Sequence, residues 1–137
     1  MKIVYDLQLM KYISLFEKIS NAKIKDLFER KGQLYCVVKK EEMNKIIGPK
    51  GKTIQKIQNM IKKKVKVIGY TDDVKEFVKG LLYPFTVENI ENKDGVIEIS
   101  CNDTKTKGLL IGRERQNLSE LKQIVSRYFD INDIKVI

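Results

Sequence analysis

The sequence predicts an α+β protein built from two consecutive units of the same kind. One order of apolar patterns, helix, strand, strand, helix, helix, strand, occurs twice along the chain. A short turn recurs between the last two helices, first at Ile47-Gly48 and again at Ile111-Gly112. Charge separates the halves, because residues 1–70 hold 17 basic and 6 acidic residues and residues 71–137 hold 10 and 12. We therefore expect an α+β fold made of one unit over 1–70 and a second unit over 71–137.

Periodicity and turn signals define the elements of the first unit. Asp6 is a candidate N-cap, and apolar residues at helical spacing follow it to about Ser20. Lys31-Gly32 is a hairpin signal between two extended runs. The expected elements are an extended lead-in over 1–5, a helix over 6–20, strands over 23–30 and 34–38, helices over 41–47 and 52–63, and a strand over 65–68.

The second unit repeats this order. Thr71-Asp72-Asp73 is a helix-start signal, and Asp94-Gly95 is a hairpin-turn signal. An offset of 64 residues superposes the two turns, and the closing strands then match after five extra residues in the second unit. The expected elements are a helix over 74–82 that Pro84 stops, strands over 85–91 and 96–101, helices over 103–111 and 118–128, and a strand over 134–137.

The turn Gly48–Gly51 carries the residues that we expect to matter most for function. Gly48 and Gly51 can take positive φ and let another backbone come close, while Pro49 favours a turn. Lys50 and Lys52 place cations beside the free N–H groups at the start of the next helix, where the helix dipole also favours an anion. The expected ligand of this turn is therefore a phosphate.

The corresponding turn of the second unit departs from this pattern, because Arg115 stands in the place of Gly51. A side chain there restricts φ and the approach of a phosphate backbone. Arg113 and Arg115 still offer charge, and arginine can form two parallel hydrogen bonds to one phosphate. Two interpretations stay open: an altered nucleic-acid site, or a unit that mainly packs against and orients the first.

Composition supports a folded protein with a polyanionic partner. The net charge is +9 and 42% of the residues are hydrophobic, which is ample for a core. The segment Lys62-Lys63-Lys64 with Lys66 adds cations beyond the turn. No run approaches the roughly 18 apolar residues of a membrane span, and the N-terminus has no secretory pattern. We expect a cytoplasmic protein with no membrane partner.

Catalysis and cofactor binding are not expected. Gly51-Lys52-Thr53 ends like a nucleotide-binding P-loop, but that motif needs glycine where this chain has Ile46, and a strand where it predicts a helix. The chain has no histidine, and Cys36 and Cys101 are far apart and more typical of buried apolar residues than of a metal pair. We therefore expect no enzyme, metal or small-molecule cofactor. A nuclease with scattered carboxylates and a metal stays open as an alternative.

These features together resemble known families. A helix–G-x-x-G–helix with basic loop residues is how a KH domain holds about four nucleotides, and the order of elements resembles the type II KH fold. The loops 47–51 and 111–117 look like its two signatures. The stretches 11–17, 70–73 and 129–137 are similar to archaeal NusA-like proteins. The resemblance implies two tandem type II KH domains, each a three-stranded mixed sheet with helices on one face. It places a GxxG loop at 48–51 and a variant GxxR loop at 112–115.

The resemblance also implies a function. It implies binding of single-stranded RNA across both units and a role in transcription termination or antitermination, with RNA polymerase or other transcription factors as further candidate partners. A KH-type ribosome-assembly or RNA-processing factor stays open as the alternative, as does a protein-interaction scaffold. We expect Ile46, Ile47 and Ile54 to line an apolar groove for the bases. The expected RNA-binding residues are Ile46, Ile47, Gly48, Pro49, Lys50, Gly51, Lys52 and Ile54 in the first unit, and Gly112, Arg113, Glu114, Arg115 and Asn117 in the second.

Overall fold

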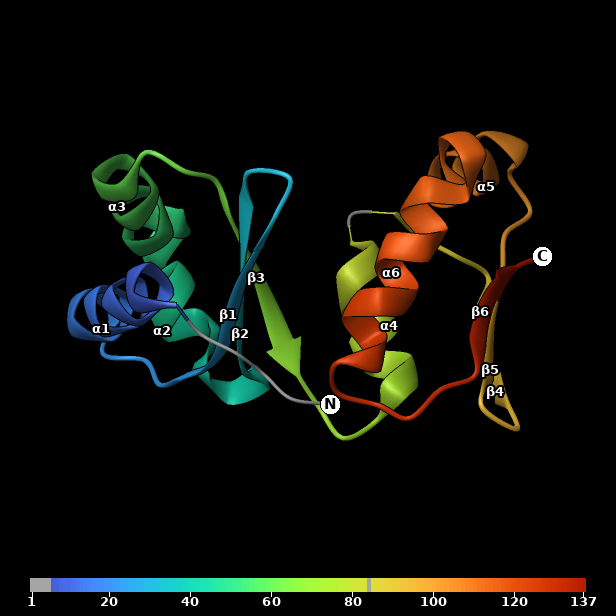
Figure 1. Cartoon of the computed structure of the whole chain (residues 1–137), viewed down its shortest axis with the longest axis horizontal. Coiled ribbons are helices and arrows are strands. Elements are labelled where there is room, and N and C mark those ends of the chain that lie inside the picture. Colours follow the sequence, from blue (N-terminus) through green and yellow to red (C-terminus); the bar gives the residue numbers. More distant parts are fainter. Residues whose placement is uncertain (1–5, 84) are drawn as a thin grey trace. The chain divides into compact units, whose positions relative to one another are not determined.

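The computed structural model describes residues 6–83 and 85–137 (Figure 1). It is a mixed α+β structure with two three-stranded sheets. The chain divides into two compact units, one ending at Thr71 and the other spanning Asp72–Ile137. The lead-in over 1–5 and the stop at Pro84, both expected from the sequence, lie outside the described residues.

The first unit places β2 at the centre of its sheet, antiparallel to β1 and parallel to β3. Asp6 caps the first helix as predicted, since its carboxylate accepts a hydrogen bond from the Leu9 N–H at 2.8 Å. The helices lie together on one side of the sheet (Figure 1). The elements are α1 (Leu7–Ser20), β1 (Ile24–Arg30), β2 (Gln33–Lys39), α2 (Met43–Ile47), α3 (Lys52–Ile61) and β3 (Val65–Tyr70), with 3-10 turns over Lys40–Glu42 and Pro49–Gly51.

The core of the first unit lies between its sheet and its helices. Alternate residues of the strands point to this side, and one buried isoleucine from each of the two short helices joins them. Ile46 anchors α2 and Ile57 anchors α3, and both are completely buried. The helix on each side of the turn is therefore fixed to the core by a buried isoleucine. The buried members are Phe16, Ala22, Leu27, Leu34, Cys36, Val38, Ile46, Ile57 and Val65.

The second unit repeats this topology, with β5 antiparallel to β4 and parallel to β6. The helix expected to start at Asp103 begins at Thr104, and Asp103 caps it by accepting a hydrogen bond from the Lys105 N–H at 3.1 Å. The elements are α4 (Val74–Leu82), β4 (Asn89–Lys93), β5 (Val96–Ser100), α5 (Thr104–Ile111), α6 (Gln116–Ser126) and β6 (Asp133–Val136), with a 3-10 turn over Arg113–Arg115.

Several predicted boundaries in this unit are shifted, and two of the shifts have a clear physical reason. The strand expected from Phe85 begins only at Asn89, because its partner strand ends at Ser100, the residue opposite Asn89. The helix expected to reach Tyr128 ends at Ser126. Tyr128 and Phe129 lie beyond the end of the helix and pack on Phe77 of α4. The centroid of the Phe77 ring is 5.4 Å from that of Tyr128 and 5.3 Å from that of Phe129. The longer connection therefore adds an aromatic cluster to the second unit. Among the described residues, no helix combines the length and apolar character that crossing a membrane requires.

Candidate nucleic-acid interface

Gly48 begins the turn between α2 and α3 in a conformation that glycine alone adopts readily. Its φ is 77° and its ψ is 172°. Its N–H donates to the Asn44 carbonyl at 2.9 Å, and its own carbonyl accepts from the Gly51 N–H at 3.1 Å. A β-carbon at this position would lie 2.1 Å from Oγ1 of Thr53. Backbone conformation and packing therefore both require glycine at position 48.

The rest of this turn is open. Lys50 and Gly51 both adopt left-handed conformations, with φ of 53° and 73°. A β-carbon on Gly51 would meet no atom within 4 Å. The surface at Gly51 can therefore be approached closely, as a phosphate backbone requires.

Within residues 6–83 and 85–137, no side chain caps the amino end of α3. Helices α1, α4 and α5 each begin with an aspartate whose side chain accepts a backbone N–H. Helices α3 and α6, which follow the two turns, have neither a side-chain cap nor an acidic residue in the first turn. The Lys52 and Gln116 N–H groups donate to the Pro49 and Arg113 carbonyls of the preceding 3-10 turns, while the dipoles of both helices still favour an outside anion at this end.

Three lysines in the first turn and in the first half of α3 are also available. Lys50, Lys52 and Lys56 are exposed, and within the part of the chain that the structure describes they form no ion pair with a carboxylate. In contrast, Lys45 forms an ion pair with Glu42 at 2.9 Å. Hydrogen bonds from the Lys45 side chain and then from the Lys23 N–H lower the pKa of Glu42. The turn and the first half of α3 therefore carry three exposed lysines without a carboxylate partner among the described residues.

The predicted cationic segment after α3 is less available than its composition indicates. Lys63 forms an ion pair with Glu29, and this hydrogen bond raises the pKa of the lysine. Burial lowers the pKa of Lys66 on β3, so its charge is less favourable there. Lys62 and Lys64 remain exposed.

The turn of the second unit has the same backbone shape despite its different sequence. Gly112 has φ 75° and ψ 173°, and Glu114 has φ 54°. Arg115 takes φ 60° and ψ 23°, close to the 73° and 15° of Gly51. The Arg115 N–H donates to the Gly112 carbonyl at 3.2 Å, as Gly51 does to Gly48. The restriction on φ expected at Arg115 therefore does not change the path of the turn.

Asn117 supports this second turn from within. A β-carbon on Gly112 would lie 2.6 Å from Cγ of Asn117. The Asn117 amide also donates to the Leu109 carbonyl at 2.9 Å, which fixes the last turn of α5. The side chain of Asn117 is thus engaged with its own unit.

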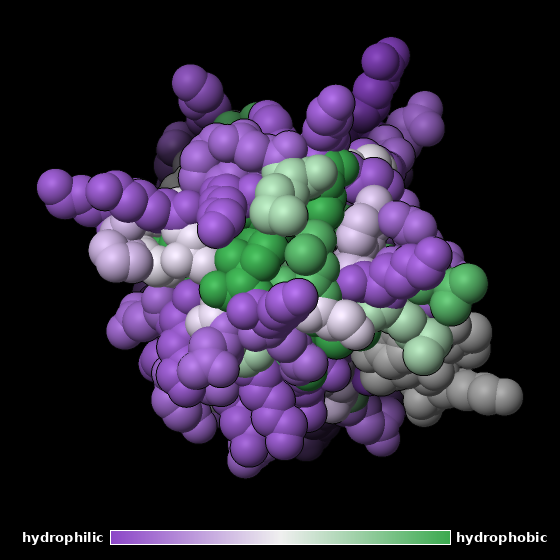
Figure 2. All heavy atoms as spheres, turned by 90° about the vertical axis from the view of Figure 1, so that its left-hand side faces the viewer, coloured by the Kyte–Doolittle hydropathy of each residue, from purple (hydrophilic) through white to green (hydrophobic). Residues whose placement is uncertain are grey.

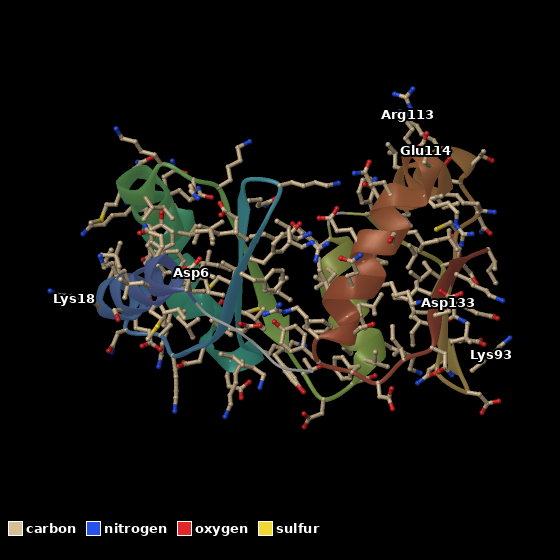
Figure 3. The ribbon with its side chains drawn as sticks, in the orientation of Figure 1. Asp6, Lys18, Lys93, Arg113, Glu114 and Asp133 are labelled. Carbon is tan, nitrogen blue, oxygen red and sulfur yellow. The ribbon has the colours of Figure 1, made fainter. Side chains whose placement is uncertain are left out.

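Charge is what distinguishes the two turns. At the offset of 64, Glu114 takes the place of Lys50 and Gln116 takes the place of Lys52. Arg113 and Arg115 add cations that the first turn lacks. Figure 3 shows Arg113 projecting outward from the turn between α5 and α6, with Glu114 beside it. The second turn is therefore a mixed-charge version of the first.

The three isoleucines expected to line a groove have different environments. Ile46 is completely buried in the core of the first unit, so its expected place on a groove surface was wrong. Ile47 and Ile54 are only partly buried and pack against the edge of that core. Figure 2 shows an apolar patch surrounded by polar side chains on the helical side of this unit.

One feature at this site was not predicted from the sequence. An open hollow of about 520 Å³ lies beside the first turn, bordered by Lys50, Gly51 and Lys52 and by four residues of α3. The four are Gln55, Lys56, Asn59 and Met60. These four residues are spaced to share the face of the helix opposite the buried Ile57, and this spacing could have predicted an exposed polar face beside the turn.

Comparisons with known proteins agree with this architecture. The profile of the KH domain family matches residues 11–93, from α1 through β4. The probable transcription termination protein NusA of Methanocaldococcus jannaschii is 30% identical over 129 residues, covering 91% of this chain and 70% of that protein. The protein of the same name from Halococcus morrhuae is 28% identical over 130 residues, covering 93% of each.

A solved structure supports the fold alone. The crystal structure of APE1850 superposes with a TM-score of 0.73 at 22% identity, covering 97% of this chain and 100% of that one. The family profile covers more than half of the chain, and the relatives named above align with most of it. The chain therefore belongs to the KH domain family and, within it, to the archaeal NusA-like proteins.

Proposed function

We propose that this protein binds single-stranded RNA and acts in transcription termination or antitermination. The names of its relatives support the transcription role. Membership of the KH family supports the ligand, because KH domains hold single-stranded nucleic acid. In this proposal the first type II KH domain spans residues 1–70 and the second spans 71–137.

One observation carries the assignment of the RNA site to the first turn. The uncapped amino end of α3 lies beside exposed lysines that have no carboxylate partner among the described residues, next to the open surface of Gly51. N–H groups, dipole and side-chain charge thus all favour an anion at one place. A phosphodiester backbone is the anion that a KH loop holds.

The proposed mechanism is binding without chemistry. The backbone from Gly48 to Gly51 holds the RNA strand, and Lys50 and Lys52 neutralise its phosphates. Bases lie over apolar side chains that include Ile47 and Ile54, and base edges supply the sequence preference. Neutralising about four phosphates of a single strand gives a log–log salt slope near −3.

The second unit extends this surface in the proposal. Its turn keeps the backbone shape of the first, and Arg113 and Arg115 supply cations there. Glu114 reduces the net charge of that turn, so we expect a smaller contribution to affinity than from the first unit.

The test is RNA titration of the wild type against Pro49→Asp/Lys50→Asp. Aspartate tolerates the left-handed conformation of position 50, so we expect normal folding. Affinity falls by at least about tenfold, or roughly 1.4 kcal/mol. The matched control is Lys75→Glu/Thr86→Glu, which makes the same change in net charge at exposed positions outside both turns. Equal affinity of wild type and the Pro49/Lys50 variant would remove this turn from the site.

The transcription role needs a separate experiment. We expect the tagged protein to co-purify with RNA polymerase or with transcription complexes after RNase treatment. Enrichment of small-subunit ribosomal precursors instead would replace the transcription role with ribosome assembly, while leaving the RNA site intact.

A further inference from the structure

The outward face of α3 has the properties of an RNA-contacting surface beyond the turn. Apolar residues of this helix face the core, with Ile57 completely buried. On the other side of the helix, Lys52, Lys56 and Met60 follow one another at intervals of four, so they align along one face. The open hollow of about 520 Å³ runs from the turn along this face.

The lining of the hollow is cationic and contains no carboxylate. Lys56 lies one helical turn beyond Lys52, about 6 Å further along the axis. Neither lysine forms an ion pair within residues 6–83 and 85–137. The two cations therefore continue the positive charge of the turn along the helix.

Polar and apolar groups for the rest of a nucleotide lie beside these cations. The Gln55 side-chain N–H donates to Oδ1 of Asn59 at 3.3 Å, which holds the two amides together. Gln55 and Asn59 are both exposed, so the side-chain oxygen of Gln55 can accept and the side-chain nitrogen of Asn59 can donate a hydrogen bond at the surface. Met60 is 54% exposed, a large apolar side chain at the end of the hollow. The side-chain amides of Gln55 and Asn59 can form hydrogen bonds with hydroxyl groups and base edges of RNA, and the Met60 side chain can pack against the face of a base.

The corresponding helix of the second unit, α6, lacks these cationic and exposed apolar side chains. At the offset of 64, Glu120 takes the place of Lys56 and Gln116 takes the place of Lys52. Ile124, at the position of Met60, is only 4% exposed. The chemistry of the hollow is therefore specific to the first unit and does not follow from the fold.

We propose that the outward face of α3 binds the RNA nucleotides that flank the segment held by the first turn. Lys56 contacts a phosphate of the flanking segment, and Gln55 and Asn59 contact its sugars or base edges. This inference rests on the proposed function, because the RNA must first reach the turn Gly48–Gly51.

The experiment compares two oligoribonucleotides, one of about four nucleotides, the length that a KH loop holds, and one of about twelve. Lys56→Gln removes one cation and keeps a good helix former, so the fold is retained. We expect the longer RNA to bind about threefold to tenfold more weakly and its salt slope to lose about 0.7 in magnitude. The short RNA binds with unchanged affinity.

Two further variants separate the possible failures. Lys18→Gln on α1 is the charge-matched control, since Lys18 is exposed and points away from its helix (Figure 3), and it leaves both affinities unchanged. Pro49→Asp/Lys50→Asp weakens both RNAs, and a lack of effect there contradicts the site assignment under the proposed function. An unchanged salt slope for the longer RNA with Lys56→Gln, or an equal loss with both lengths, overturns the inference about α3 alone.

Discussion

Oγ1 of Thr53 lies only 2.1 Å from the point that a β-carbon on Gly48 would occupy. In the second unit the side chain of Asn117 fills the same place, with Cγ 2.6 Å from a β-carbon built on Gly112. In each unit, the second residue of the helix after the turn therefore packs against the first glycine. This contact ties the start of the turn to the helix whose amino end faces the proposed ligand.

Replacing Gly48 should therefore be far more damaging than replacing Gly51. Gly48→Ala combines a glycine-only conformation with a steric clash, and we expect the free energy of unfolding to fall by about 3 kcal/mol. In Gly51→Ala the new β-carbon would contact no other atom. The free energy of unfolding should therefore fall by only about 1 kcal/mol, the strain of a left-handed alanine. Urea denaturation of both variants measures the difference, and equal losses would contradict the role of Thr53.

Arg115 should be replaceable by glycine without loss of stability. Its left-handed φ of 60° costs about 1–2 kcal/mol, which glycine would relieve. Glycine also increases the entropy of the unfolded chain, which offsets about 0.4–1 kcal/mol of that gain. We expect Arg115→Gly to unfold in urea at the same concentration as wild type or slightly higher. A clear decrease would show that the arginine side chain makes a stabilising contact.

Ile46 should affect stability and leave RNA binding unchanged. Truncating this completely buried side chain in Ile46→Ala should cost about 3 kcal/mol, and Ile46→Val about 1 kcal/mol. Because Ile46 does not reach the surface, folded Ile46→Val should bind RNA with the affinity of wild type in a titration. Ile47→Val is the comparison, since Ile47 is partly exposed. A weaker affinity for Ile46→Val, with that of Ile47→Val unchanged, would place Ile46 in the groove after all.

Cys36 should make stability fall at high pH. Burial, followed by the charges of Asp26 and Glu17, raises the pKa of its thiol from 9.0 to about 12. The folded state therefore keeps a proton that the unfolded state loses above about pH 9. Its contribution to stability is complete below that pH and is lost as pH rises toward about 12. Denaturant unfolding from pH 8 to 11 should show a steeper decline for wild type than for Cys36→Ala, and parallel curves would contradict this assignment.

The order of the elements could be predicted from the sequence because its signals are local. The Asp6 and Asp103 caps and the Asp94-Gly95 hairpin each depend on residues within a few positions of one another. The start of β4 could not be placed this way, because it depends on where the partner strand ends at Ser100.

The candidate site was predictable in outline but not in detail. The glycines and lysines of the first turn stand together in the sequence, so their proximity was evident. Ile46 and Ile47 are adjacent in a five-residue helix, and periodicity over so short a stretch cannot decide which one faces the core. The pairing of Lys63 with Glu29 joins residues 34 positions apart, which only the folded sheet brings together. The shape of the turn at Arg115 likewise depends on its hydrogen bond to Gly112.

The retained shape of the second turn bears on how related proteins are recognised. A motif search that demands both glycines of G-x-x-G discards a turn in which Arg115 holds the same backbone path. The first glycine together with a small polar residue five positions later, as in Gly48 with Thr53 and Gly112 with Asn117, describes both turns. Genome surveys that use this spacing would recover divergent KH units that the two-glycine pattern passes over.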